Sequence, residues 1–215
     1  MPGGVAAYRI TGRSAPGGCA ANRITGRSAP GIWPSRGLGV TPFAMVSGTI
    51  RIIGFDPGLT RTGWGVIEAV GVKLVHIANG AIATTASETL GVRLATLHDE
   101  LCAILKAYAP DTVAVEQVFV AKNPSAALKL GHARAIALLA AAQAGLPIAE
   151  YAPNHIKKSV VGVGHAGKEQ VQAMVRRLLP TAQFKSADAA DALACAIAHA
   201  HLARTNARIA AALAS

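Results

Sequence analysis

The sequence lacks the features of secreted, zinc-binding and membrane-spanning proteins. Its three cysteines are widely spaced and include no Cys-x-x-Cys pair, so neither a disulfide framework nor a zinc ribbon is expected. The apolar run at 135–149 is too short and too rich in alanine to cross a membrane. No charged start is followed by the apolar core of a signal peptide. We therefore predict a cytoplasmic protein with no membrane partner.

Acidic residues are also scarce, and charge is unevenly distributed. The chain has 21 Lys and Arg against 11 Asp and Glu. Residues 1–50 contain five arginines and no acid, so the remaining 16 basic residues face all 11 acids in 51–215. A basic excess indicates a polyanionic partner such as nucleic acid, although many soluble proteins share it without such a partner.

The N-terminal segment repeats one string, "RITGRSAPG", at Arg9–Gly17 and again at Arg23–Gly31. These copies have no apolar face to bury, so we expect residues 1–48 to form a disordered tail. Two further interpretations stay open. The tail is upstream sequence ahead of a true start at Met45, or it is a transit peptide, which the absence of acids favours and the glycines and prolines oppose.

Hydrophobic patterning predicts one domain over residues 49–204, followed by a short tail at 205–215. The pattern predicts strands and helices in the order β-β-β-α-β-α-β-α-α. The expected strands are 49–56, 62–70, 72–85, 112–120 and 147–152, and the expected helices are 89–109, 124–144, 168–179 and 186–204. This order predicts an α/β fold, a mixed five-stranded sheet whose first three strands form a meander, flanked by helices.

One glycine motif is misleading. The stretch "GVGHAGK" at Gly162–Lys168 matches a dinucleotide fingerprint and most of a phosphate loop. A phosphate loop requires Ser or Thr after the lysine, whereas Glu169 follows here, and no strand follows as a dinucleotide fold requires. We expect a flexible loop before a helix, with Lys168 available as a phosphate contact.

The last helix carries two acids, Asp188 and Asp191, three residues apart in an alanine-rich sequence. Residues at this spacing share one helix face, which Cys195 and His199 continue, while apolar residues face the other way. An ordinary structural explanation exists, because Ser186 can cap the helix and acids in a first turn complement its dipole.

Two further acids make a metal site the stronger hypothesis. Asp56 ends an apolar strand, and Glu116 interrupts another. Carboxylates packed together without cations repel one another, so a divalent metal is the expected compensating charge. Ligation by oxygen alone favours Mg²⁺ or Mn²⁺ over zinc. His199 is an alternative ligand, but His199 and His201 face different directions on a helix and do not reach one ion together.

Three stretches that carry these acids resemble the acidic motifs of the bacterial RuvC-type Holliday junction resolvases. They are "IIGFDPGLTRTGWGVI", "VAVEQVFVAKNPSAALKLGHARA" and "SADAADALACAIAHAH", and the resemblance runs from Arg51 to His201. It implies a ribonuclease H-like fold and a homodimer, joined through the helix after Asn123, that nicks two opposed strands of four-way junction DNA during recombination and repair. It also implies a branch-migration motor of the RuvA and RuvB type as partner.

The resemblance assigns roles to individual residues. Four carboxylates are implied to be catalytic and to hold two Mg²⁺ ions, with Mn²⁺ as a substitute: Asp56, Glu116, Asp188 and Asp191. Four other residues are implied to contact DNA, the first at the junction bases and the lysines near the scissile phosphate: Phe119, Lys157, Lys158 and Lys168.

Other functions stay open at this point. The chain is alternatively another ribonuclease H-like nuclease, one that processes RNA or resolves junctions on its own, or a junction-binding module without catalysis. The string "DPGLT" also resembles the first phosphate loop of actin-like ATPases and sugar kinases. Those proteins need two such domains, which this length does not supply.

Overall fold

The computed structural model describes residues 48–117 and 124–214, without the side chains of 206–214. The predictions for the N-terminal tail, for Phe119 and for an Asn123 cap lie outside these residues. The strands are β1 Thr49–Asp56, β2 Arg61–Val70, β3 Lys73–Ala83, β4 Thr112–Glu116 and β5 Ile148–Tyr151. The helices are α1 Leu90–Tyr108, α2 Pro124–Gln143, α3 Pro153–Val161, α4 Lys168–Leu178 and α5 Ala187–Ala214.

The five strands form one mixed sheet in the order β3-β2-β1-β4-β5. Strands β1, β2 and β3 pair antiparallel in sequence order, which confirms the predicted meander. Strand β4 lies parallel to β1, and β5 lies parallel to β4. The carboxyl ends of β1 and β4 therefore meet at the same edge of the sheet.

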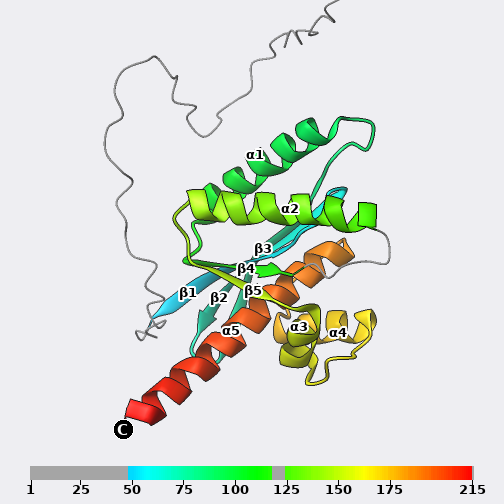
Figure 1. The fold of residues 1–215 in the computed structure, drawn as a ribbon. Coiled ribbons are helices and arrows are strands. Elements are labelled where there is room, and N and C mark those ends of the chain that lie inside the picture. Colours follow the sequence, from blue (N-terminus) through cyan, green and yellow to red (C-terminus); the bar gives the residue numbers. More distant parts are fainter. Residues whose placement is uncertain (1–47, 118–123, 215) are drawn as a thin grey trace, which may run out of the picture. The chain divides into compact units, whose positions relative to one another are not determined.

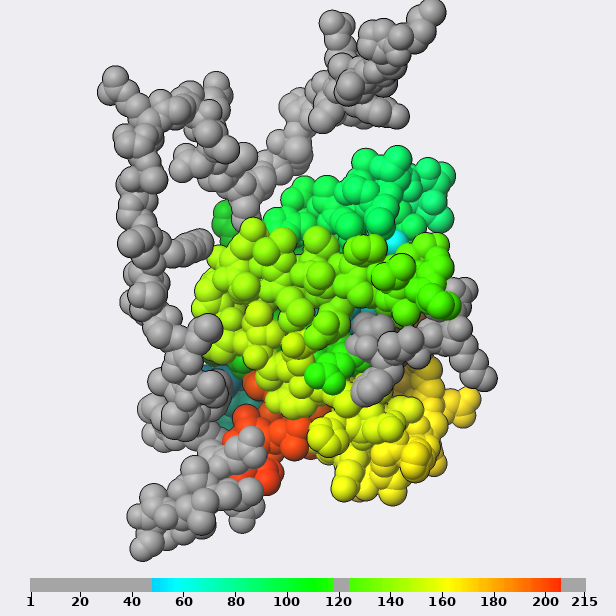
Figure 2. Space-filling model, viewed as in Figure 1, coloured from blue at the N-terminus to red at the C-terminus, as the bar shows by residue number. Residues whose placement is uncertain are grey.

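Helices cover both faces of the sheet. Helices α1 and α2 pack on one face, and α3, α4 and α5 pack on the other (Figure 1). Alternation along β1 sends Ile53 and Phe55 into the first core and Ile52 into the second. Helix α2 presents its outer side to the viewer in Figure 2. Among the described residues, no helix has the length and hydropathy required to cross a membrane.

Helix α5 lies directly on the backbone of the sheet because glycines replace side chains beneath it. A Cβ added to Gly54 would be 2.1 Å from the carbonyl oxygen of Ala192, and one added to Gly65 would be 2.7 Å from the Leu193 side chain. Close approach buries residues 192–200 of α5, including Cys195, which is 0% exposed. Asp188 and Asp191, near the start of the helix, stay half-buried.

Helix α5 also differs from prediction in length. Its start is as expected, since the Ser186 hydroxyl accepts a hydrogen bond from the Ala189 N–H at 3.2 Å and caps the first turn. It continues to Ala214 rather than ending near Arg204. No glycine or proline interrupts 187–214, and alanine has the highest helix propensity, so the predicted tail extends the helix.

Helix α3 was not predicted, although the sequence carries its signals. Pro153 stands at the first helical position, where proline is favoured. Ile156 and Val160 are spaced four residues apart and are both buried. The helix ends at Gly162, whose φ of 93° is a conformation that glycine adopts readily.

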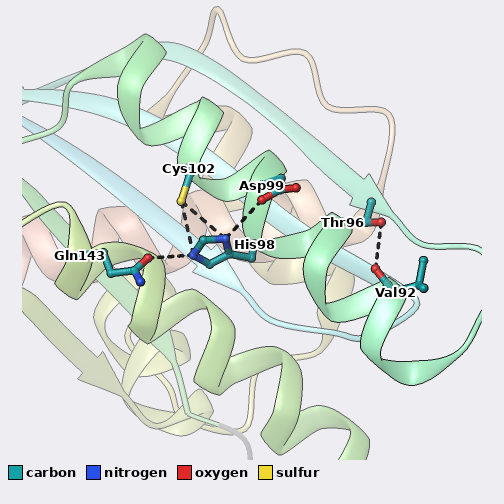
Figure 3. Close-up of polar contacts among 6 residues, drawn as sticks. All are labelled: Val92, Thr96, His98, Asp99, Cys102 and Gln143. Carbon is teal, nitrogen blue, oxygen red and sulfur yellow. Dashed lines mark hydrogen bonds and ion pairs between the residues drawn. The ribbon is translucent and has the colours of Figure 1, made fainter. Parts of the chain in front are cut away.

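A polar contact joins the two helices on the other face. The His98 ring nitrogen Nε2 on α1 lies 2.8 Å from Gln143 Oε1 at the end of α2 (Figure 3). The Cys102 sulfur lies 3.6 Å from the same nitrogen. His98 therefore has a structural role at the α1–α2 contact.

Candidate metal-dependent nuclease site

Asp56 and Glu116 come from neighbouring parallel strands. Asp56 ends β1, Glu116 ends β4, and the residues before them, Phe55 and Val115, pair across the two strands. The two carboxylates therefore stand side by side at the carboxyl edge of the sheet, which is where open α/β sheets bind ligands.

The first turn of α5 brings Asp188 to the same edge. Gly63 on β2 pairs with Asp56, and a Cβ built on Gly63 would lie 1.9 Å from the Asp188 carbonyl oxygen. Asp191 follows one turn later on the helix. The structure thus collects all four predicted carboxylates from β1, β4 and α5 at one place.

The carboxylates perturb one another strongly. Burial raises the pKa of Asp56 to about 7, and the negative charges of Asp191 and Asp188 contribute to the increase. Burial raises the pKa of Glu116 to about 8, with further contributions from Asp56 and Asp191. Desolvation and like charge both disfavour the ionised form. The cluster is therefore short of positive charge.

Two of the predicted lysines supply part of that charge. Lys168, at the start of α4, places its Nζ 3.0 Å from Asp191 Oδ2, and this hydrogen bond raises the pKa of the lysine. Lys157 on α3 acts on Glu116 by its charge. Both lysines line a pocket of about 230 Å³ together with Glu116 and Asp191.

Lys158 lies elsewhere. It lines a separate pocket with His155 and His201 on the other side of α3. Consecutive residues on a helix point about 100° apart, so only Lys157 of the pair faces the carboxylates. The structure does not bring Lys158 to the candidate site, and Phe119 lies outside the described residues.

His199, the alternative metal ligand, points to the other end of β4 from Glu116. Its Nδ1 lies 2.7 Å from the Tyr151 hydroxyl, and its Nε2 lies 3.3 Å from Oγ1 of Thr112, the first residue of β4. Burial lowers the pKa of His199 to about 4. This geometry matches a buried, neutral histidine that links α5 to the sheet.

The structure adds two residues that the sequence analysis did not assign to the site. Arg61 begins β2, and its Nε lies 3.8 Å from Asp188 Oδ2. Cys195 lies one turn after Asp191, and burial raises the pKa of its thiol well above the usual value. The position of Cys195 was visible in the helix periodicity, whereas nothing in the sequence paired Arg61 with Asp188.

The donor set fits a hard divalent cation. The four carboxylates lie close enough for their charges to raise the pKa values of Asp56 and Glu116. They offer only oxygen ligands, which suits Mg²⁺ or Mn²⁺. Among the described residues, no group of three ligand side chains is already arranged around a single point. Lys168 engages Asp191 at this edge of the sheet.

Sequence comparisons identify related proteins. Residues 52–199 match the family model described as "Crossover junction endodeoxyribonuclease RuvC". A protein of this name from Parvibaculum lavamentivorans is 58% identical over 165 residues, which cover 77% of this chain and 94% of the relative. Its namesake from Brucella anthropi is 57% identical over 153 residues, covering 71% of this chain and 89% of the relative.

Solved structures give the same result for the fold. Thermus thermophilus RuvC in complex with a Holliday junction substrate superposes with a TM-score of 0.70 at 34% identity, covering 74% of this chain and 97% of that chain. The yeast mitochondrial Holliday junction resolvase Ydc2 reaches a TM-score of 0.56 at 10% identity, covering 75% and 83%. At that identity the likeness concerns the fold alone. The predicted ribonuclease H-like fold is confirmed.

Proposed function

Because the chain belongs to the RuvC family of crossover junction endodeoxyribonucleases, we propose that it resolves Holliday junctions by nicking two opposed strands. The observation that carries the proposal is the meeting of Asp56, Glu116, Asp188 and Asp191 at one sheet edge. Lys157 and Lys168 stand beside these acids. Acids that hold cations and lysines that face an anion are the parts required for phosphodiester hydrolysis.

The four carboxylates would hold two divalent cations, Mg²⁺ or Mn²⁺. Such ions activate the attacking water and stabilise the leaving oxygen. The protein's own groups orient the scissile phosphate. Lys157 and Lys168 would bind its oxygens and stabilise the charge that develops on them. Lys168 would exchange its contact with Asp191 for one with the phosphate.

We further propose a homodimer formed through α2, so that two sites act on opposed strands. Leu128 and Leu139 are 66% and 46% exposed, and residues eleven apart lie on nearly the same helix face. Both lie on the outer side of α2. A partner copy would cover these two side chains.

The remaining proposals follow from family membership. A RuvA and RuvB-type motor would deliver the junction, and recombination and repair in the cytoplasm would be the setting. Phe119 would contact junction bases. Lys158 would contact DNA away from the scissile phosphate, because it faces a different pocket from the carboxylates.

The experiment compares a four-way DNA junction, a linear duplex and an RNA–DNA hybrid as substrates with Mg²⁺. We expect paired nicks in the junction only, with Asp56→Asn abolishing cleavage while junction binding is retained. Preferential cutting of the hybrid would favour another ribonuclease H-like nuclease. Binding without cutting would favour a non-catalytic module, and full-rate cutting by Asp56→Asn would refute the metal assignment.

A further inference from the structure

A second groove leads away from the carboxylates, on the side opposite Lys157 and Lys168. It has a volume of about 690 Å³ and runs from Asp56 and Asp188 between the β1–β2 turn and helices α1 and α2. Its other charged lining residues are all basic: Arg61, Arg93 and Lys129. The groove is therefore acidic at the site and basic beyond it.

Arg93 differs from the other two basic residues because it is buried. It comes from the first turn of α1 and is 9% exposed. Its Nε donates to Thr84 Oγ1 at 2.9 Å, and its Nη2 donates to the Leu59 carbonyl at 3.2 Å and to Thr60 Oγ1 at 3.3 Å. These bonds tie the turn that follows Asp56 to helix α1.

Every protein acceptor of Arg93 in the described part of the chain is a neutral oxygen. No carboxylate in residues 48–117 or 124–205 lies within 4.0 Å of its guanidinium. A buried guanidinium normally has an anionic partner, because desolvation of an uncompensated charge is costly. The charge of Arg93 therefore lacks the partner that its burial calls for.

The guanidinium also has a free donor group on the groove side. Nη1 makes no hydrogen bond to a described residue. Among the described residues, one buried side-chain nitrogen or oxygen has no hydrogen-bond partner, and it is Arg134 Nε. Nη1 of Arg93 is therefore not a buried atom. Nη1 is thus reached by solvent, and the groove is the solvent-filled space that Arg93 lines.

We propose that Arg93 binds a backbone phosphate of the DNA strand in this groove, next to the scissile phosphate, while its other donors hold the turn after Asp56. The inference rests on the proposed junction cleavage and adds a contact to it. A guanidinium whose fork is already fixed by three bonds is preorganised for a phosphate oxygen. Arg93 would position both the turn and the strand, and the lysines would hold the opposite side of the phosphate.

The test is a double-mutant cycle. Wild-type protein and Arg93→Gln are each compared on junctions in which one phosphate flanking the cut, at one position at a time, is replaced by a neutral methylphosphonate. Junction binding is measured in EDTA, where no cleavage occurs. We expect one methylphosphonate position that weakens wild-type binding about 10-fold and has no effect on Arg93→Gln. The slope of log affinity against log salt should also fall by about 1 in the variant. Additive effects at every position would overturn the proposal.

Three controls make the result specific. Arg51→Gln removes a half-buried arginine that is bonded to Glu68 and Tyr108 at the far end of β1, and it should stay sensitive to every methylphosphonate. If Arg93→Gln does not fold, Arg93→Lys replaces it. The lysine keeps the charge without the fork, so the sensitive position should then lose part of its effect, and an unchanged effect would refute the phosphate contact. Wild-type cleavage with Mg²⁺ tests the proposed function separately.

Discussion

Among the uncharged residues near the site, Gly63 should tolerate substitution least, because helix α5 packs directly on it. An alanine Cβ there would lie 1.9 Å from the Asp188 carbonyl oxygen, whereas real Cβ atoms essentially never come closer than 3.0 Å. The first turn of α5 must then move by at least about 1.1 Å, the difference between these distances. That movement carries Asp188 away from Asp56.

The displacement sets the expected magnitudes for Gly63→Ala. Misplacing a catalytic group by about 1 Å costs about 100-fold in rate, and overpacking a core contact costs about 1–3 kcal/mol of stability. Single-turnover cleavage of a four-way junction measures the first effect, and urea unfolding measures the second. Junction affinity without metal should change little, because the proposed phosphate contacts lie on α3, α4 and the groove.

Gly91→Ala is the matched control. The same substitution in α1 meets no atom within 4 Å, and alanine is the better helix former, so stability should be equal or higher and cleavage unchanged. If Gly63→Ala instead cleaves at the Gly91→Ala rate with wild-type stability, α5 does not rest on β2 as described, and the account of how Asp188 is positioned is wrong.

Three further predictions concern charge. Lys157→Ala should slow single-turnover cleavage about 100-fold, while its neighbour Lys158→Ala should not; equal losses would contradict the orientation of α3. Because His199 has a pKa of about 4 when folded against 6.5 otherwise, the unfolded chain binds the proton first as pH falls below 6.5. Wild-type stability should therefore fall by about 2 kcal/mol from pH 7 to pH 5 relative to His199→Asn in urea unfolding, and parallel curves would refute this. Folded Asp56 and Glu116 keep their protons up to about pH 7 and 8, whereas their ordinary pKa values are 3.8 and 4.5. The unfolded chain therefore releases these protons first, and stability falls as pH rises between these ordinary values and the raised ones. Mg²⁺ should accordingly raise the melting temperature more at pH 8 than at pH 6, and a rise independent of pH would count against cation binding at these acids.

The sequence predicted the sheet well because its signals are local. The strand ending at Asp56 and the meander after it follow from apolar runs and turn residues. The clustering of the acids also followed, since Asp56 and Glu116 each interrupt an apolar strand. Helix α3 was not predicted, although Pro153 and the spacing of Ile156 and Val160 mark it in the sequence.

Contacts between distant segments were not predictable in the same way. The burial of Arg93 depends on Thr84 and Leu59 lying under the start of α1, and no periodicity encodes that. The difference between Lys157 and Lys158 needs the rotation of α3 about its own axis. Burial of residues 192–200 of α5 needs the glycines of β1 and β2 to lie beneath the helix, which is a property of two strands and a helix together.

The acids are split between the first strand and the last helix of the domain, which matters during synthesis. A nascent chain that has emerged as far as β5 already displays Asp56 and Glu116 but lacks the aspartates of α5. Chains whose translation stops early would therefore lack two of the four proposed ligands. If these acids hold the metal ions as proposed, cleavage would begin only after the C-terminal helix has been made and has docked.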